Sequence, residues 1–382
     1  MADRLLGSLP RLFRRMAMDR IRRRDRSGPP VVVAHFAGRI GANGPRTTLE
    51  RVLASHLSQR YEFVRMHQPG ANGGLNPRLL RDWVAMLRQV RPDLIHVRGL
   101  QNEGFHGVLA ARLAGVPRVL VSVHGTVRDL TGPPTWRRRL LVGVAEPFTL
   151  RAATHVATVC EYAAARPFIR AVGERFVGVI PNGVPVPSRP HAARERTRKA
   201  LGLPPDATVM ITVSRLTWEK GFRSLAEALR RLSGGPRPVL LVAGDGPDRP
   251  EIEAELRAVA GLDLRMLGTR DDVPDLLSAA DLFVFPTLHE NLSNALLEAM
   301  AYGLPVVATA VGGNTEVLRL GGGRLVPPDA PDELAAALAA LLADPAERAY
   351  LAAIGEKVVR ENYSLDTMLT TLDATYRRIL ES

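Results

Sequence analysis

The sequence predicts an α/β protein with two doubly wound domains, each a parallel sheet covered by helices on both faces. Short apolar runs alternate with segments of helical spacing from Val31 onward, and the alternation restarts at Val209 after a Pro-rich, charged stretch at residues 181–206. Continuous apolar strands between helices are typical of buried parallel sheets. The 382 residues give enough length for two or three domains of about 150 residues each.

The predicted elements follow in chain order. In the first domain, strands are expected at residues 31–36, 93–97, 118–124 and 153–159, and helices at residues 49–59, 77–90 and 105–114. In the second domain, strands are expected at residues 209–214, 238–243, 264–267, 282–286 and 305–308, and helices at residues 222–232, 251–260, 273–278 and 291–302. Further helices follow Asp329, and the last is expected at residues 365–380.

These elements set the expected domain boundaries. Residues 1–28 form a basic amphipathic segment, residues 29–188 an N-terminal α/β domain and residues 189–364 a C-terminal α/β domain. Residues 365–382 form a helix that is expected to return to the N-terminal domain.

The composition excludes several classes of protein. Hydrophobic residues make up 46% and charged residues 24%, as in soluble globular proteins, which excludes disordered and fibrous chains. No apolar run approaches the ~18 residues of a membrane-spanning helix, and residues 1–30 lack the apolar core of a secretory signal. The lone Cys160 excludes an intrachain disulfide and a Cys-based zinc site. We therefore expect a soluble, cytoplasmic protein.

The charge is unevenly distributed along the chain. Residues 1–190 carry 30 basic and 12 acidic side chains, whereas residues 191–382 carry 21 and 27. The first half is therefore expected to face an anionic partner: nucleic acid, anionic lipid or an acidic substrate. A codon bias explains why nearly all the basic residues are Arg, but it does not explain their placement. No recognised nucleic-acid-binding module is present, so we expect no nucleic-acid partner.

Two basic segments have the pattern of membrane-surface elements. In residues 9–24, Leu9, Leu12, Phe13 and Met16 recur at helical spacing among arginines, which favours a helix lying on an anionic membrane. The alternative is a solvated tail. At residues 136–141, an aromatic residue and two leucines flank three arginines, which indicates either a second membrane contact or an ordinary surface helix.

Two pairs of charged residues follow strands of the second domain, where ligands of parallel sheets bind. Arg215 follows the strand at residues 209–214, and Lys220 precedes a helix, so both cations suit a phosphate group. Glu290 is expected at the entrance of the helix after the strand at 282–286, with Glu298 two turns further on the same face. Carboxylates accept hydrogen bonds from vicinal sugar hydroxyls. The alternative for each pair is a set of solvated surface charges.

Three further features are less specific. The loop that ends at Gly44 is rich in glycine but lacks the G-x-G-x-x-G spacing, although its backbone N–H groups can approach an anion. His124 ends a strand and has either a structural or a catalytic role. The adjacent Asp271 and Asp272 open a predicted helix without a supporting cluster of ligands, so we interpret them as a helix cap and not as a metal site.

Together these segments resemble the retaining glycosyltransferases of family 4, which have the two-domain architecture called GT-B. The strongest resemblance lies in S-R-L-T-W-E-K-G at residues 214–221 and in residues 290–317, with E-x7-E, E-A-M-A-Y-G-L-P-V-V-A-T and V-G-G. The resemblance runs from about Val31 to Leu380 and is weaker in the first domain. Two positions depart from it: Cys160 replaces a frequent Ser, and Pro185 replaces an acidic residue after Asn-Gly-Val.

The resemblance implies two domains that face each other across a cleft, an acceptor-side domain first and a nucleotide-sugar domain second. It assigns Arg215 and Lys220 to the donor diphosphate, Glu298 to the ribose, Glu290 to the transferred sugar and His124 to the surroundings of the anomeric carbon. Gly44 would approach the distal phosphate, residues 268–270 would border the base, and the N–H groups of residues 291–294 would support the sugar. The implied catalytic residues are His124, Arg215, Lys220 and Glu290. The implied donor-binding residues are Gly44, Arg215, Lys220, Gly268, Thr269, Arg270, Glu290, Asn291, Leu292, Ser293, Asn294 and Glu298.

The resemblance further implies a function. The expected enzyme transfers a sugar, with retention and without a metal or other cofactor, from a nucleotide-diphosphate sugar (UDP rather than GDP) to a lipid-linked or cell-envelope glycan. It would act at the inner face of the cell membrane as a peripheral protein. Two alternatives stay open: an isomerase like the nucleotide-sugar 2-epimerases, and a non-catalytic homologue that binds nucleotide or membrane.

Overall fold

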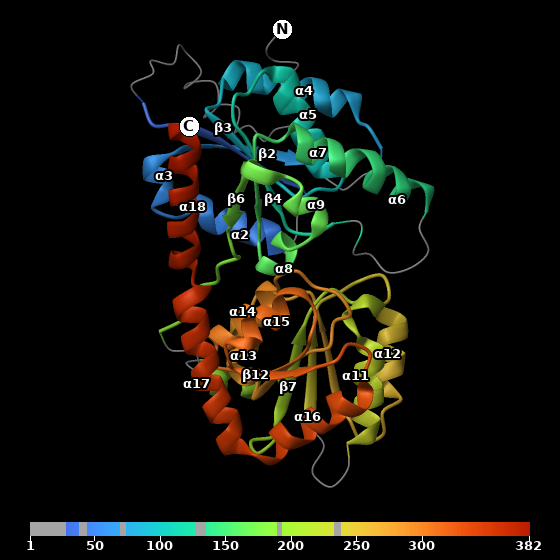
Figure 1. Cartoon of the computed structure of the whole chain (residues 1–382). Coiled ribbons are helices and arrows are strands. Elements are labelled where there is room, and N and C mark those ends of the chain that lie inside the picture. The colour runs from blue at the N-terminus through green and yellow to red at the C-terminus, as the bar shows by residue number, and fades with distance from the viewer. Residues whose placement is uncertain are drawn as a thin grey trace. The chain divides into compact units, whose positions relative to one another are not determined.

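The computed structural model describes residues 28–37, 44–68, 74–126, 128, 135–188, 193–232 and 238–382. Its internal contacts divide the chain into two compact units (Figure 1). Unit 1 comprises the chain up to Thr158 together with Pro167–Gly178 and Leu372–Ser382, and unit 2 comprises Val159–Arg166 and Val179–Thr371. The units are thus interleaved along the sequence. The basic helix predicted in residues 9–24 lies outside the described residues.

Each unit contains a six-stranded sheet, which confirms the predicted α/β class. In unit 1 the strand order is β2-β1-β3-β4-β5-β6, and the pairs from β2 to β5 are parallel. In unit 2 the order is β12-β11-β10-β7-β8-β9, and all five pairs are parallel. Because parallel strands end at the same edge of a sheet, the loops after them are gathered there.

The elements of unit 1 alternate between strand and helix. The strands are β1 (Val31–Ala37), β2 (Glu62–Gln68), β3 (Leu94–Arg98), β4 (Val119–Val123), β5 (His155–Thr158) and β6 (Phe176–Val179, which extends one residue into unit 2). The helices of this part of the chain are α2 (Gly44–Leu53), α3 (Leu57–Arg60), α4 (Pro77–Val90), α5 (Asn102–Ala114), α6 (Trp136–Leu140), η3 (Leu141–Ala145), α7 (Glu146–Ala152), α8 (Glu161–Ala164), α9 (Pro167–Arg170) and η4 (Gly173–Arg175). Of these, α8 belongs to unit 2.

Unit 2 repeats the alternation. Its strands are β7 (Val209–Val213), β8 (Val239–Ala243), β9 (Asp263–Gly268), β10 (Leu282–Phe285), β11 (Val306–Thr309) and β12 (Gly323–Val326). The helices are α10 (Arg194–Ala200), η5 (Trp218–Lys220), α11 (Phe222–Arg231), α12 (Arg249–Arg257), α13 (Val273–Ala279), α14 (Asn294–Ala301), α15 (Gly312–Arg319), α16 (Pro331–Ala343), α17 (Pro345–Asn362) and α18 (Leu365–Glu381). The last of these ends in unit 1.

Both faces of the unit 2 sheet are buried, as continuous apolar strands require. In β10, Phe283 and Phe285 belong to one core cluster, whereas Leu282 and Val284 belong to another. Successive side chains of a strand point to opposite faces, so one four-residue strand contributes to two cores. Strands of this kind are hydrophobic at every position, and this is why β10 was predictable.

The strands β2, β6 and β12 were not predicted, because they lack a continuous run of buried apolar residues. The pattern of β2 is polar, and only Met66 and Gln68 of its residues are buried. The four residues of β6 are all partly exposed, and β12 begins at Gly323 with only Val326 buried. The predicted strands have buried residues at most positions. The exception is β9, which was predicted although all its residues are partly exposed.

One predicted helix is broken into two. The segment expected as a helix at 49–59 forms α2 and α3, separated by a turn at residues 54–56. The Ser55 hydroxyl donates to the Val52 carbonyl at 2.6 Å and accepts from the Leu57 N–H at 3.2 Å. Serine competes in this way with the helical hydrogen bonds of the backbone.

The end of α18 is tied into unit 1 by buried polar contacts. The Tyr376 hydroxyl lies 2.7 Å from His96 Nδ1, and His96 Nε2 lies 2.5 Å from Ser122 Oγ. Burial and the nearby Arg98 charge lower the pKa of His96 well below its usual value, so the ring is neutral. One turn earlier, Asp373 accepts a hydrogen bond from the Tyr61 hydroxyl at 2.8 Å.

Asp373 is the most testable of these contacts because it also pairs with Arg60 and Arg377. We expect Asp373→Ala to lower the free energy of unfolding by about 1–3 kcal/mol, since the Tyr61 hydroxyl loses its acceptor in a buried place. The half-exposed arginines are solvated and add little. Urea denaturation measures the change. The exposed Asp366 of the same helix provides the control, and Asp366→Ala should cost no more than about 0.5 kcal/mol. Equal losses for the two variants would contradict this role of Asp373.

Candidate active site

The candidate site lies at the carboxyl edge of the unit 2 sheet. The loops that follow β7, β8, β10 and β11 all leave the sheet at this edge. They carry residues 214–221, 244–248, 286–293 and 310–311. Four loops from one edge can enclose a ligand from several sides, as is typical of open parallel sheets.

Glycines hold these loops against one another. At Gly221, where φ is +76°, a Cβ would overlap the carbonyl oxygen of Pro286. At Gly312, where φ is +48°, a Cβ would overlap the carbonyl oxygen of Glu290. Only glycine combines a positive φ with such a close approach, so the loops after β7 and β11 each pack against the loop after β10.

The loop after β8 stabilises the loop after β7. The Asp248 carboxylate accepts from the Trp218 N–H at 3.0 Å, and the Leu216 N–H donates to the Asp245 carbonyl at 3.0 Å. Gly244 and Gly246 allow this contact, because a Cβ at either would overlap a carbonyl oxygen of the β7 loop. The segment that carries Arg215 and Lys220 is therefore fixed from two sides.

An ion pair joins two of the predicted residues. Lys220 Nζ lies 2.9 Å from Glu290 Oε2, and the side chains are only 16% and 21% exposed. Lys220 Nζ also lies 5.6 Å from the centre of the Phe285 ring, a cation–π distance. Lys220 therefore has an anion and an aromatic face beside its amino group.

Arg215 has a different environment. Its side chain is 64% exposed, and its guanidinium donates to Glu219 Oε1 at 2.8 Å. The Glu219 carbonyl in turn accepts from the Leu288 N–H at 2.9 Å, so Glu219 connects Arg215 to the loop after β10. The two predicted phosphate-binding cations therefore lie on one loop, and each is paired with a carboxylate. Sequence reasoning did not assign a role to Glu219.

The loop after β10 differs from the prediction in one respect. Glu290 was expected at the helix entrance, but α14 begins at Asn294, and Ser293 is its N-cap, with the Ser293 hydroxyl accepting from the Leu296 N–H. Glu290 thus lies in the loop before α14, and this loop ends at the N-cap residue Ser293. Its Oε1 accepts from the Asn291 N–H at 3.2 Å. Glu298 is in α14, partly exposed and just over one turn after its start.

A buried hydrogen bond supports this loop from elsewhere in the chain. The Asn182 side-chain amide donates to the Leu292 carbonyl at 3.0 Å, and both residues are buried. The Gly313 N–H donates to the Asn291 carbonyl at 2.6 Å. Residues 291 and 292 therefore have their carbonyls occupied by protein donors. No local pattern in the sequence marks the partner of Asn182, which lies 110 residues away in the chain.

The segment expected to border the base ends β9. Gly268 accepts from the Gly244 N–H at 2.8 Å and has φ of +67°, and Thr269 follows it. The Arg270 guanidinium donates to both oxygens of Asp272, at 2.7 and 2.5 Å. This hydrogen-bonded pairing lowers the pKa of Asp272 and raises that of Arg270. The predicted helix cap is therefore half right: Asp272 is at the N-cap position of α13, but its side chain pairs with Arg270 and not with the helix backbone.

Two predicted residues belong to unit 1. Gly44 begins α2 after β1, and His124 follows β4, so both come after strands of that sheet. Burial and the nearby Arg98 charge lower the pKa of His124 to about 3. His124 is therefore neutral at physiological pH, and its ring can donate or accept a hydrogen bond but cannot act as a resident cation.

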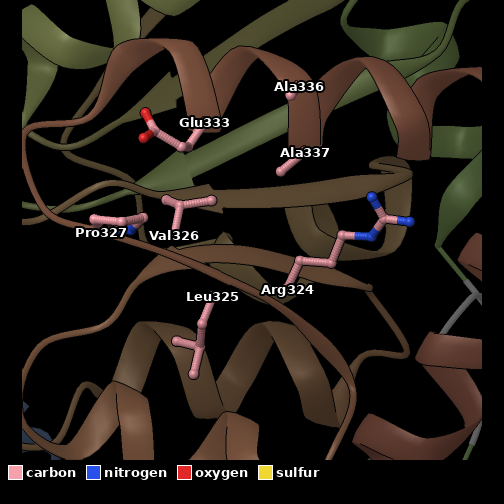
Figure 2. Close-up of a pocket in the computed structure, with 7 residues that line it drawn as sticks. All are labelled: Arg324, Leu325, Val326, Pro327, Glu333, Ala336 and Ala337. Atoms are coloured by element: carbon pink, nitrogen blue, oxygen red, sulfur yellow. The ribbon is translucent and has the colours of Figure 1, made fainter.

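A cavity of about 470 Å³ in unit 2 contains none of these residues. It lies between β12 and α16 (Figure 2). Its lining residues are Arg324, Leu325, Val326, Pro327, Glu333, Ala336 and Ala337. The Arg324 guanidinium pairs with Glu347 at 2.7 Å, and Figure 2 shows Leu325 pointing to the opposite side of the strand from Val326. Its two charged lining residues are Arg324 and Glu333, and neither was among the predicted site residues.

The described residues contain neither a metal-binding cluster nor a membrane-spanning helix. Within the ranges that the structure describes, no group of three or more His, Cys, Asp and Glu side chains is placed to hold a metal ion. Within the same ranges, no helix combines the length and the apolar character needed to cross a membrane.

Both halves of the chain match known families. Residues 40–186 match Glycosyltransferase Family 4, and residues 207–344 match Glycosyl transferases group 1. The fold is shared with a sucrose-phosphate synthase from Thermosynechococcus elongatus, with a TM-score of 0.77 at 21% identity over 92% of this chain and 99% of that one. It is also shared with HepE from Anabaena in complex with UDP and glucose, with a TM-score of 0.75 at 20% identity over 91% of this chain and 100% of that one.

Curated relatives are more similar in sequence. The chain is 32% identical over 317 residues to a 2-deoxystreptamine glucosyltransferase of Streptomyces kanamyceticus, covering 79% of this chain and 80% of the relative. It is 30% identical over 241 residues to the UDP-Gal:alpha-D-GlcNAc-diphosphoundecaprenol alpha-1,3-galactosyltransferase of Escherichia coli, covering 60% of each. The segments that match the two families contain the loops of the candidate site, and the chain is a member of glycosyltransferase family 4, with the GT-B fold.

Proposed function

We propose that this glycosyltransferase moves a sugar from a nucleotide-diphosphate sugar, UDP-linked rather than GDP-linked, to a lipid-linked or cell-envelope glycan, with retention and without a metal ion. The observation that carries the proposal is the ion pair between Lys220 and Glu290, at 2.9 Å on adjoining loops of the carboxyl edge. A lysine suits a phosphate and a carboxylate suits sugar hydroxyls, and phosphate and sugar are the two groups joined by the bond that breaks.

Each end of the donor then has a partner in unit 2. Lys220 and Arg215 leave their carboxylate partners and bind the diphosphate, and Glu290, released from Lys220, accepts hydrogen bonds from the transferred sugar. Glu298 holds the ribose hydroxyls, and residues 268–270 border the base. Gly44 and the neutral His124 of unit 1 contribute to the distal phosphate and to the surroundings of the anomeric carbon. Family membership supports these assignments, and the contacts in unit 2 agree with them.

The chemistry follows from where charge develops. The acceptor hydroxyl oxygen attacks the anomeric carbon on the face that the diphosphate leaves, the bond from that carbon to the phosphate oxygen breaks, and the acceptor proton passes to the departing phosphate. The configuration is retained. Negative charge grows on the nucleoside diphosphate, so fixed cations stabilise the transition state more than the bound donor. Lys220 and Arg215 fill the role that a divalent cation has in other sugar transferases.

The acceptor is the least constrained part of the proposal. The relatives include one named for 2-deoxystreptamine and one for a diphosphoundecaprenol-linked sugar, so the same fold accepts both a water-soluble and a lipid-linked acceptor. A teichuronic acid biosynthesis glycosyltransferase of Bacillus subtilis, 30% identical over 66% of this chain, adds a cell-envelope acceptor. The basic first half of the chain favours the lipid-linked class. We accordingly place the enzyme in the cytoplasm, at the inner face of the cell membrane.

The alternatives have less support. A nucleotide-sugar 2-epimerase would turn over the donor without an acceptor, and a non-catalytic homologue would not need both ion pairs of the site. The family matches and the intact set of Arg215, Lys220, Glu290 and Glu298 favour transfer.

The cations provide the first test. Lys220→Ala and Arg215→Ala should each lower kcat by about 10²-fold or more, because each removes a charge that stabilises the leaving diphosphate. Steady-state transfer from UDP-sugars measures the effect, and circular dichroism checks the fold. Lys357→Ala, at an exposed lysine of α17 that also pairs with a glutamate, is the matched control and should keep full activity. Near-normal rates in both site variants would refute the phosphate assignment.

The two glutamates should differ in which kinetic constant they change. Glu298→Ala should mainly raise the donor KM, because the ribose is remote from bond breaking. Glu290→Ala should mainly lower kcat, because the sugar is the reacting group. Donor titration by calorimetry, together with kcat and KM, separates the two effects. The assignment fails if both variants show equal and small changes in affinity and rate.

Metal dependence is the third test. Transfer should continue within about twofold of its rate in excess EDTA, because the positive charge at the diphosphate comes from side chains. The assay uses enzyme dialysed against chelator. A loss of activity that magnesium or manganese restores would show that the protein cations are not sufficient.

A further inference from the structure

We infer that one helical face of unit 1 docks on an anionic lipid bilayer through Trp136, Leu140 and Val144, here called the Trp136 stripe. The inference deepens the proposed function, and its link to catalysis rests on the lipid-linked acceptor proposed there. The stripe lies on α6 and η3, which precede α7 in the chain, and Figure 1 shows α6 at the margin of unit 1.

The three side chains of the Trp136 stripe are apolar, yet more than half of each is exposed to solvent. Trp136 is 70% exposed, Leu140 54% and Val144 56%. Of the eight large apolar side chains that are exposed in the described part of the chain, these three fall within nine consecutive residues. Single exposed apolar residues are normal on protein surfaces, whereas a contiguous group indicates an interaction site.

The helix geometry aligns the three side chains. They occur at i, i+4 and i+8 of a continuous run from α6 through η3 into α7. In an α-helix, residues four apart drift by about 40° around the axis. The π-helical segment Leu141–Ala145 turns less per residue, which reduces this drift between Leu140 and Val144. The apolar side chains thus form a line and not a spiral.

The charged side chains within residues 135–145, beside the Trp136 stripe, are all positive. Arg137, Arg138 and Arg139 follow Trp136, and no acidic residue occurs between residues 135 and 145. The first acidic side chain, Glu146, is fully buried and pairs with Arg128 at 2.9 Å. The Arg137 guanidinium lies 5.4 Å from the centre of the Trp136 ring, so the cation is adjacent to the aromatic side chain. An aromatic residue inserted below headgroups, with arginines at the phosphates, is typical of interfacial helices.

This charge pattern favours a lipid surface over a second copy of the chain. In a symmetric dimer the same patch meets itself, so the arginines of both copies would come together without an acidic partner on the stripe. Anionic headgroups supply the missing negative charge, and the acyl region receives the apolar side chains. An acidic protein partner would satisfy the arginines, but three aligned apolar side chains need a continuous apolar medium.

The experiment measures partition of the full-length chain onto vesicles of phosphatidylglycerol and phosphatidylcholine (1:1) and of pure phosphatidylcholine. We expect binding to the anionic vesicles, a blue shift of Trp136 fluorescence and quenching by brominated lipid. In Trp136→Phe, which keeps an aromatic ring on the stripe, the shift and the quenching should disappear while binding persists. This assigns the signal to Trp136 and not to the other two tryptophans, Trp83 and Trp218.

Two double variants separate the apolar and the charged contributions. Trp136→Ser with Leu140→Ser, and Arg137→Ala with Arg139→Ala, should each lower the partition coefficient by about tenfold or more. The matched controls are exposed apolar residues of unit 2, Leu320→Ser with Tyr350→Ser, and exposed arginines elsewhere, Arg81→Ala with Arg196→Ala. The controls should change the coefficient by less than about twofold.

Several results would overturn the inference. These are equal binding to neutral and anionic vesicles, no loss of binding in the stripe variants beyond that of the controls, or a wild-type dimer in light scattering that Trp136→Ser with Leu140→Ser dissociates. Hydrolysis of UDP-sugars by each variant is measured in parallel without vesicles and should be unchanged. If donor turnover is absent in the wild type but vesicle binding follows the pattern above, the proposed function fails and the docking surface stands.

Discussion

The ion pair between Lys220 and Glu290 is the interaction on which the candidate site depends. Charges with so little exposure need partners, because an unpaired charge in that setting is poorly solvated. The pair can form only where the loops after β7 and β10 approach closely, and Gly221 permits this approach, whereas Gly312 lets the loop after β11 pack against the loop that carries Glu290. The parallel sheet brings the loops to one edge, the glycines close the remaining distance, and the opposite charges meet as a consequence. The candidate site is thus preorganised by the groups to which the proposal assigns the donor.

Much of the fold was predictable because burial and sequence pattern agree in most strands. The strands that are apolar at nearly every position were predicted, whereas β2, with its polar pattern and only two buried residues, was not. In the site, strand ends and charged residue types indicated Arg215, Lys220 and Glu290. Their partners were not predictable, because the contacts of Glu219 and Asn182 depend on how distant loops pack, and no spacing encodes that.

The two units use polar residues differently. In unit 2, charges gather at the sheet edge and remain partly accessible. In unit 1, neutral histidines such as His96 and His124 lie near a buried guanidinium, and burial keeps their pKa values low. A neutral imidazole forms specific hydrogen bonds without adding charge, which suits the recognition of hydroxyl groups, whereas the cations of unit 2 suit phosphate.

The interleaving of the units has a consequence for synthesis on the ribosome. Unit 1 needs Tyr376 and Asp373 to satisfy His96 and Tyr61, and these two residues follow all of unit 2 in the chain. The core of unit 2 includes Val159 and Cys160. These two residues come before most of the other unit 2 residues in the sequence. N-terminal domains generally fold first during translation. Here unit 1 stays incomplete until α18 has been synthesised, so unit 1 can be completed only after the whole of unit 2 has been translated.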